Sequence, residues 1–125
     1  MKRLLIILSL LLTPLTLFSC SKNNRYTTIS QQEAKSIMDT ESDYVILDVR
    51  TIEEYNSGHI PNAILIPNEE IKQKAESILK DKNQLILVYC RSGKRSKQAA
   101  SVLVSLGYTN IKEFGGIIDW PYEIE

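Results

Sequence analysis

One stretch constrains the fold of this chain more than any other: an apolar run, then a polar loop that begins with a cysteine, then a helical pattern. The run at 85–89 reads Leu-Ile-Leu-Val-Tyr, which is typical of a buried parallel strand. Past the loop, apolar residues recur at helical spacing and Gly107 follows where a helix commonly ends; they are Ala99, Val102, Leu103 and Leu106. This order predicts an α/β fold with Cys90 at the carboxyl end of a strand, the edge where open α/β sheets bind ligands.

The loop itself reads Cys90-Arg91-Ser92-Gly93-Lys94-Arg95-Ser96. Loop amides and the positive end of the following helix favour an anion at the cysteine sulfur, and three cationic side chains lie within five residues of it. We therefore predict that the pKa of Cys90 lies below the value of about 8.5 for a free cysteine, which makes Cys90 a nucleophile. The residues at 91–95 are the candidate ligands of an anionic substrate, and Ser96 is a supporting residue. The alternative is a buried structural cysteine beside a solvated basic face.

The length of this loop bears on two kinds of anion chemistry. A cysteine-based phosphatase needs five residues between its cysteine and the arginine that completes a ring around phosphate. Here four residues separate Cys90 from Arg95, and the next residue is Ser96. The smaller ring suits a persulfide better than a tetrahedral oxyanion, so phosphatase or arsenate reductase chemistry is the less favoured alternative.

The first residues predict a targeting segment rather than part of the fold. Lys2 and Arg3 precede an apolar run from Leu4 to Phe18, which is shorter than the roughly 20 residues that span a bilayer. The run ends in Leu-Phe-Ser-Cys at 17–20, which resembles a bacterial lipobox. The resemblance implies a signal peptide at 1–19, lipidation of Cys20 and a tether at 20–25. We expect a protein anchored by lipid to a bacterial cell membrane, on its periplasmic or outer face; a plain secreted protein or an uncleaved anchor is the alternative.

Composition limits the remaining possibilities. The chain has 125 residues with 43% hydrophobic content, so we expect one domain, at 26–125. Its 15 Lys and Arg balance 15 Asp and Glu, so net charge suggests neither nucleic acid nor a membrane surface as a partner. With one histidine and one cysteine left after lipidation, the usual ligands predict no metal site, and we expect no cofactor. Cys90 is then a lone thiol outside the cytoplasm, and such a thiol usually has a function.

The rest of the chain alternates between strand and helix patterns. Strands are expected at 26–29, 44–47, 64–66, 85–89 and 111–114. Ser30 and Glu33 form a capping-box pattern that opens a helix. A short helix at 51–57 is expected to bury Ile52 and Tyr55. A helix at about 69–80 is expected to bury a stripe of four residues, Ile71, Ala75, Ile78 and Leu79.

Two further polar groups are candidates for the rim of the site. Asp48 and Arg50 follow the second strand, so they lie at the same sheet edge as Cys90 if the strands are parallel. Arg50 could then reach a bound anion and Asp48 could accept hydrogen bonds from a loop, the alternative being a surface ion pair. His59 is the only histidine, and a hydrogen-bonded structural role is favoured over a general base, because a thiolate stabilised by cations needs no base.

The order and spacing of these segments resemble a single-domain rhodanese from about Thr28 to Trp120. The Asp-Val-Arg at 48–50 resembles that family's Asp-x-Arg, and Glu54-Tyr55 followed by Gly-His-Ile-Pro at 58–61 resembles its next motif. The loop at 90–96 is similar to the family's active-site loop, and the Gly-Gly at 115–116 with Trp120 is similar to its closing signature. Asn62 stands where glycine is usual, and the C-terminal tail is short.

The resemblance implies one rhodanese-like α/β domain, with a mostly parallel five-stranded sheet and helices on both faces. It also implies a sulfurtransferase: the Cys90 thiolate attacks the outer sulfur of a small anionic donor such as thiosulfate, becomes a persulfide and passes that sulfur to cyanide or a thiol. Cationic side chains of the loop bind the donor, and loop amides stabilise the persulfide. A sulfur-relay or binding module that serves one protein partner is the alternative, and we expect a monomer.

Overall fold

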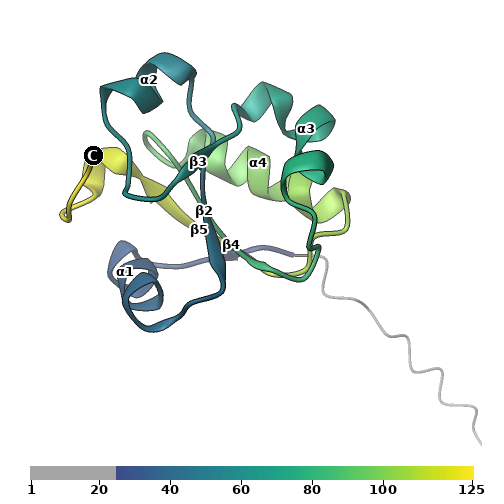
Figure 1. Ribbon diagram of the computed structural model, residues 1–125, viewed down its shortest axis with the longest axis horizontal. Helices are drawn as coiled ribbons and strands as arrows, with labels where there is room; N and C mark the ends of the chain where they lie inside the picture. Colours follow the sequence, from purple (N-terminus) through teal and green to yellow (C-terminus); the bar gives the residue numbers. More distant parts are fainter. Residues whose placement is uncertain (1–24) are drawn as a thin grey trace, which may run out of the picture.

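A single five-stranded parallel sheet forms the centre of the computed structural model, which describes residues 25–125 (Figure 1). Its strand order is β1-β5-β4-β2-β3, and all four neighbouring pairs are parallel. The strands are β1 Thr27–Thr28, β2 Tyr44–Asp48, β3 Ile64–Leu65, β4 Leu85–Cys90 and β5 Ile111–Gly116. The helices are α1 Gln31–Thr40, α2 Ile52–Ser57, α3 Ile71–Ile78 and α4 Lys94–Ser105, with 3-10 turns at Asn68–Glu70 and Ile117–Asp119. The predicted parallel α/β architecture is confirmed.

Helices cover both faces of the sheet, with α1 on one side and α3 and α4 on the other (Figure 1). Successive side chains of β4 alternate between these layers, as the pleat of a strand requires. Ile86, Val88 and Cys90 belong to the core under α3 and α4, whereas Leu87 and Tyr89 belong to the core under α1. The side chain of Cys90 is therefore directed to the face that carries α4.

Local sequence signals account for the ends of the helices and one turn. The Ser30 hydroxyl accepts the Glu33 backbone N–H at 3.0 Å and caps α1, and Thr51 forms a full capping box with Glu54 at the start of α2. Asn62 adopts a positive φ of 68°, a conformation that asparagine tolerates better than most residues and glycine tolerates best. This explains why a non-glycine residue can stand in the turn before β3.

Two sequence predictions about burial are wrong. Ile52 is 50% exposed and Ile78 is 47% exposed, although both were expected to face the core. Ile52 occupies the first position of the short helix α2, and Ile78 is the last residue of α3, which ends two residues earlier than predicted. The predicted helix at 69–80 is in fact a 3-10 turn followed by α3, so the helical phase extrapolated along it was incorrect at its end.

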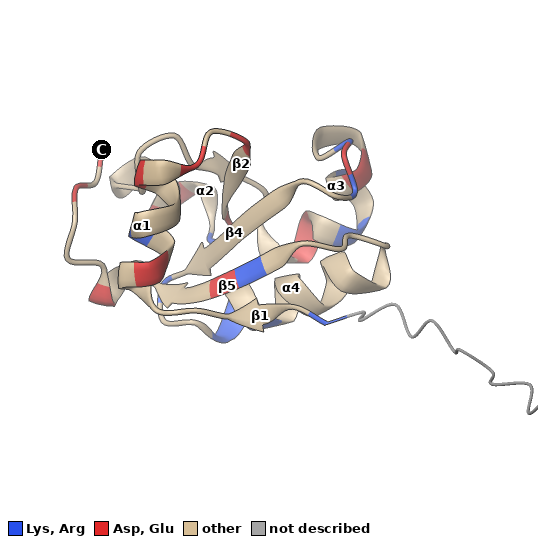
Figure 2. Cartoon of the chain, turned by 90° about the horizontal axis from the view of Figure 1, so that it is seen from below, with Lys and Arg blue, Asp and Glu red and all other residues tan. Residues whose placement is uncertain are grey.

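The described residues carry no feature that tests the predicted targeting segment. The signal peptide at 1–19, Cys20 and the tether up to residue 24 lie outside the described residues. Within residues 25–125, no helix is both long and apolar enough to cross a bilayer. Figure 2 shows Lys and Arg interspersed with Asp and Glu over the elements of this domain, in line with the balanced charge.

Candidate active site

Cys90 is the last residue of β4, and the loop that follows it leads directly into α4. The side chain is buried, and the backbone N–H of Gly93 donates a hydrogen bond to Sγ at 3.0 Å. The Ser96 Oγ, on the first turn of α4, lies 3.5 Å from Sγ. The predicted placement of Cys90 at a strand's carboxyl end, below a helix N-terminus, is confirmed.

Two glycines make this loop possible. Gly93 has a φ of 108°, a left-handed conformation that side chains rarely adopt, and it brings the backbone N–H back toward the sulfur. Gly116, on the neighbouring strand β5, packs so closely on the loop that a Cβ there would lie 1.9 Å from the Arg91 carbonyl oxygen. The Gly-Gly at the end of β5 therefore lets the loop lie against the sheet.

Hydrogen bonds around the sulfur lower the pKa of Cys90 below its ordinary value. Burial acts in the opposite direction, because it penalises the charged form, but the hydrogen bonds from Ser96 and from the backbone amides of Gly93 and Ser92 outweigh it. The direction agrees with the sequence prediction. The main cause differs, because the prediction attributed the shift to the helix dipole and the cations as well as to the amides.

The cationic side chains of the loop fall into two groups. The side chains of Arg91 and Lys94 are exposed, and neither forms a hydrogen bond or ion pair within the 25–125 range. Arg95 instead makes two hydrogen bonds to Glu54 of α2, with Nη1–Oε1 at 2.6 Å and Nη2–Oε2 at 2.9 Å. The guanidinium of Arg95 is thus engaged, and it connects the start of α4 to α2 rather than standing free for an anion.

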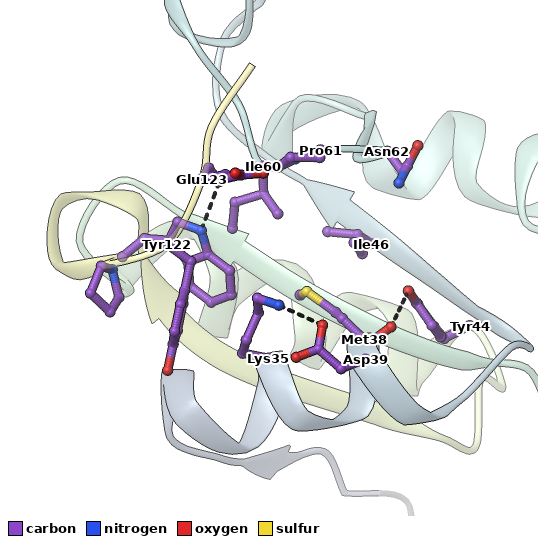
Figure 3. A pocket seen from close by; sticks show the side chains of 12 residues that line it. Lys35, Met38, Asp39, Tyr44, Ile46, Ile60, Pro61, Asn62, Tyr122 and Glu123 are labelled. Carbon is purple, nitrogen blue, oxygen red and sulfur yellow. Dashed lines mark hydrogen bonds and ion pairs between the residues drawn. The ribbon is translucent and has the colours of Figure 1, made fainter.

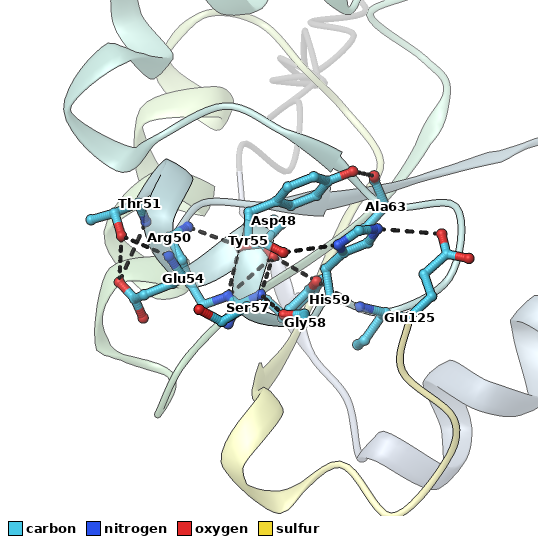
Figure 4. A network of polar contacts seen from close by, with 12 residues as sticks. Asp48, Arg50, Thr51, Glu54, Tyr55, Ser57, Gly58, His59, Ala63 and Glu125 are labelled. Atoms are coloured by element: carbon cyan, nitrogen blue, oxygen red, sulfur yellow. Dashed lines mark hydrogen bonds and ion pairs between the residues drawn. The ribbon is translucent and has the colours of Figure 1, made fainter.

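A second predicted ligand, Arg50, is also engaged within the fold (Figure 4). Its Nη2 donates to Asp48 Oδ2 and to the Gly58 carbonyl oxygen, both at 2.7 Å, and only 5% of the residue is exposed. Asp48 also accepts the Arg50 backbone N–H at 2.9 Å and the Tyr89 hydroxyl at 2.7 Å. Burial and then the Asp48 hydrogen bond raise the pKa of Tyr89. Asp48 and Arg50 thus belong to a buried network and are not the surface ion pair considered above, whereas Arg50 as an anion ligand stays a prediction.

His59 has the structural environment that the sequence favoured. Its ring stacks on Tyr55, with centroids 3.8 Å apart and planes within 4° of parallel. Nδ1 lies 3.0 Å from the Tyr55 carbonyl oxygen and Nε2 lies 3.3 Å from Glu125 Oε1 (Figure 4). Backbone hydrogen bonds in both directions join His59 to Glu125, so this histidine anchors the C-terminal tail.

Sequence reasoning missed two carboxylates. Glu54 was noted only as part of a motif, and its pairing with Arg95 joins positions far apart in the chain. Glu113 on β5 is fully buried, and its Oε1 accepts the Ser96 hydroxyl at 2.7 Å. The alternation of β5 could have shown its burial, because Ile111 and Glu113 are two residues apart and share a face of the strand.

Two hollows differ in their relation to the loop. One of about 370 Å³ lies beside Arg91 and is lined by eight residues, Arg50, Glu54, Ser57, Gly58, Arg91, Ile117, Ile118 and Ile124. The other, of about 710 Å³, lies between α1 and the C-terminal tail, and none of the residues 90–96 lines it (Figure 3). Of these two, only the first borders the loop at 90–96, through Arg91. Within residues 25–125, no group of three His, Cys, Asp or Glu side chains is placed to hold a metal ion.

Comparison with known proteins agrees with this geometry. Residues 30–121 match the family model described as the rhodanese-like domain. Among curated proteins, the chain is 40% identical over 73 residues to the thiosulfate sulfurtransferase PspE of Escherichia coli, covering 58% of this chain and 70% of that protein. It is 38% identical over 92 residues to a sulfurtransferase of Allochromatium vinosum, covering 73% of this chain and 83% of that protein.

Solved structures give the same result. A structure described as a rhodanese with anions from Escherichia coli superposes with a TM-score of 0.62 at 35% identity, covering 66% of this chain and 96% of that one. A rhodanese-like domain protein from Staphylococcus aureus superposes with a TM-score of 0.68 at 32% identity, covering 79% and 96%. From its fold, its loop and these matches, the chain belongs to the rhodanese-like domain family.

Proposed function

We propose that this protein is a sulfurtransferase that moves a sulfane sulfur from thiosulfate, or a donor of that class, to cyanide or a thiol through a persulfide on Cys90. The observation that carries the proposal is the environment of the sulfur: a buried Sγ that accepts a backbone amide at 3.0 Å and whose pKa is lowered. A cysteine in such an environment is a nucleophile, and the amide that binds its sulfur can also donate to the anionic sulfur of a persulfide. The names of the relatives, a thiosulfate sulfurtransferase and a sulfurtransferase, support the same reaction.

The first step forms one S–S bond and breaks another. The Cys90 thiolate attacks the outer sulfur of thiosulfate, the bond between the two sulfur atoms of thiosulfate breaks, and sulfite leaves with the electron pair. Cys90 then carries a persulfide whose terminal sulfur is anionic. The backbone amides of Ser92 and Gly93 stabilise that charge, as they stabilise the thiolate.

The second step returns the enzyme to its starting state. Cyanide, or the thiolate of an acceptor, attacks the terminal sulfur of the persulfide, and the bond to Cys90 breaks with the electron pair on the Cys90 sulfur. The products are thiocyanate or the acceptor's persulfide, together with the Cys90 thiolate. A low pKa for Cys90 favours this step too, because it makes the cysteine a better leaving group.

Donor binding is assigned to Arg91 and Lys94, with the backbone of Ser92 and Gly93. Both side chains are exposed on the loop that follows Cys90 and have no side-chain partner within the 25–125 range, whereas the guanidinium groups of Arg50 and Arg95 bind Asp48 and Glu54. Arg91 also lines the hollow of about 370 Å³ beside the loop. The solved rhodanese with anions supports an anionic ligand for this site.

A persulfide relay that serves one protein partner is the second candidate. Exposed apolar side chains border the same hollow: Ile118 is 63% exposed and Ile124 is 56% exposed. A protein carrying the acceptor thiol could cover them, whereas cyanide or a small thiol gains nothing from them. The phosphatase alternative loses support, because Arg95 is bound to Glu54 instead of completing a ring around phosphate.

The test is the formation of thiocyanate from thiosulfate and cyanide by the purified protein, compared with Cys90→Ser. We expect activity in the wild-type protein and none in the variant, with an unchanged circular dichroism spectrum. Activity that survives in the variant contradicts the mechanism. Transfer to a protein thiol without transfer to cyanide supports the relay.

The cellular placement is part of the same proposal. The lipobox-like residues at 17–20 support cleavage after residue 19, lipidation of Cys20 and a tether at 20–25 that carries a monomeric domain outside the cytoplasm. We expect wild-type protein in the membrane fraction of a bacterial host and Cys20→Ala protein to lose its lipid. Unmodified Cys20 in the wild-type protein contradicts the anchor.

A further inference from the structure

The hydroxyl of Ser96 has more hydrogen-bond acceptors around it than it has protons to donate. Its Oγ lies 2.7 Å from Glu113 Oε1, 2.9 Å from the Gly93 carbonyl oxygen and 3.5 Å from Cys90 Sγ. A serine hydroxyl has one proton to donate. Since Glu113 Oε1 is the nearest of the three acceptors, it takes that proton when Cys90 is a thiol. The lone pairs of Oγ then face the sulfur. They can accept a hydrogen bond from the S–H of a thiol, whereas they repel a thiolate.

Glu113 is held firmly in the position that makes this competition possible. It pairs with Val88 in the sheet and is buried on the face that carries Cys90 and α4. The extra residue of β5 between this pair and the pair of Cys90 with Gly116 is a β-bulge, a feature that re-aims side chains next to active sites. The Gly115 backbone N–H donates to Oε1 at 2.8 Å, and the Thr28 hydroxyl donates to Oε2 at 3.2 Å.

We propose that Glu113 is a positioning residue which competes with the Cys90 sulfur for the single hydroxyl proton of Ser96, and thereby limits the fraction of Cys90 present as thiolate. The inference rests on the proposed function, because it concerns the sulfur that reacts. When Cys90 ionises, its proton leaves to water, and the Ser96 O–H turns from Glu113 to the sulfur without any covalent bond of Ser96 being broken. A thiol that is restrained in this way is less exposed to oxidation before a donor binds.

Other charged groups around the two acids come from several elements. On α4 these are Arg95, which interacts with the charge on Cys90, and Lys97, which lines a third hollow, of about 340 Å³, together with Glu113. The loop contributes Arg91 and Lys94, and Asp119 follows β5. From β1 and α1 the facing side chains are the uncharged Thr28 and Gln31. None of the cations has a hydrogen bond or ion pair to Glu113 in residues 25–125, where its carboxyl group is bonded to the Thr28 and Ser96 hydroxyls and the Gly115 amide.

The test is the pH dependence of alkylation of Cys90 by iodoacetamide in the full chain, followed by the mass of the Cys90 peptide, for wild type and Glu113→Gln. Glutamine fits this position, since its oxygen can accept from Gly115 and its nitrogen can donate to the Thr28 oxygen. The Cys90 sulfur lies 3.5 Å from Ser96 Oγ, which lies 2.7 Å from Glu113 Oε1, so the carboxyl group is at most about 6 Å from the sulfur. Replacing the carboxylate by an amide at that distance is expected to lower the alkylation midpoint by roughly 1–2 pH units. A merely structural role predicts the opposite, because a loosened loop loses its amide donors. An unchanged or raised midpoint, with the melting temperature kept, overturns the proposal.

Two further variants separate competition for the proton from charge alone. In a Ser96→Ala background, Glu113→Gln is expected to lower the midpoint by a smaller amount; an equally large effect there overturns the role given to Ser96. Thr28→Val removes a donor from Oε2 and strengthens the carboxylate as an acceptor, so the midpoint is expected to rise. Thr28 is exposed in β1, so valine is tolerated there and Thr28→Val remains a test if Glu113→Gln does not fold. An alkylation midpoint in Thr28→Val that is unchanged or lowered overturns the proposal. Alkylation needs no sulfur donor, so these shifts stand or fall separately from transfer activity.

Discussion

The ion pair between Glu54 and Arg95 leads to a prediction that separates a structural role from donor binding. The pair is bidentate, at 2.6 and 2.9 Å, and the hydrogen bond to Arg95 is the main reason why the pKa of Glu54 falls from 4.5 to about 2. A fall of that size corresponds to about 3 kcal/mol at 1.36 kcal/mol per pKa unit. Each side chain is 28% exposed, so solvent screening reduces the contribution to about 1–2 kcal/mol.

The sign of the pH dependence follows from the direction of this change. Because the folded-state pKa lies below the unfolded value, the pair stabilises the fold at pH values above 4.5, and the contribution is lost as pH falls toward about 2. We therefore expect Glu54→Gln to lower the free energy of unfolding by about 1–2 kcal/mol at pH 7. The difference from wild type should shrink steadily between pH 5 and pH 3.

The assay is urea unfolding followed by circular dichroism at pH 7, 5 and 3, for wild type, Glu54→Gln, Arg95→Met and the double variant. The coupling energy from this cycle isolates the pair. Equal stability of Glu54→Gln and wild type at pH 7, or a difference that grows on acidification, refutes the reasoning. In the transfer assay, Arg95→Met is expected to change the KM for thiosulfate less than loss of Arg91 does, since its guanidinium is already engaged.

Three other changes test separate parts of the account. Replacing Arg91 and Lys94 together by alanine should raise the KM for thiosulfate at least tenfold and leave the unfolding midpoint within error; an unchanged KM removes both from donor binding. Asp48→Asn leaves a buried guanidinium without its counter-charge and should cost about 3–5 kcal/mol of stability in urea unfolding; a loss below 1 kcal/mol contradicts the buried network. Gly116→Ala should prevent the loop from packing on β5, because the new Cβ meets a carbonyl oxygen at 1.9 Å, so a variant with wild-type activity contradicts the described loop.

The strand-loop-helix pattern around Cys90 predicted both the parallel sheet and the place of Cys90 at the end of β4, because each depends on local periodicity and on the glycines that end helices and form turns. The same reasoning placed Asp48 at the correct sheet edge. The errors at Ile52 and Ile78 lie at helix ends, where a helical phase carried along the sequence no longer describes the backbone.

The partners of charged side chains could not be predicted in the same way. The pair between Glu54 and Arg95 joins residues 41 apart in the sequence, and only the tertiary fold shows that the guanidinium is engaged. Ser96 and Glu113 likewise meet because α4 packs over β5. The anion site at the loop stays a prediction from its residue types, and the ion pairs that Arg50 and Arg95 make within the fold could be found only from coordinates.

The most direct test of the central claim is the intact mass of the purified protein before thiosulfate, after thiosulfate and after subsequent cyanide. We expect a gain of one sulfur atom, located on the Cys90 peptide, that cyanide removes with release of an equal amount of thiocyanate. Cys90→Ser should show no gain under the same conditions. A wild-type protein that gains no sulfur, while its Cys90 thiol remains free to react with iodoacetamide, contradicts a persulfide mechanism with thiosulfate as donor.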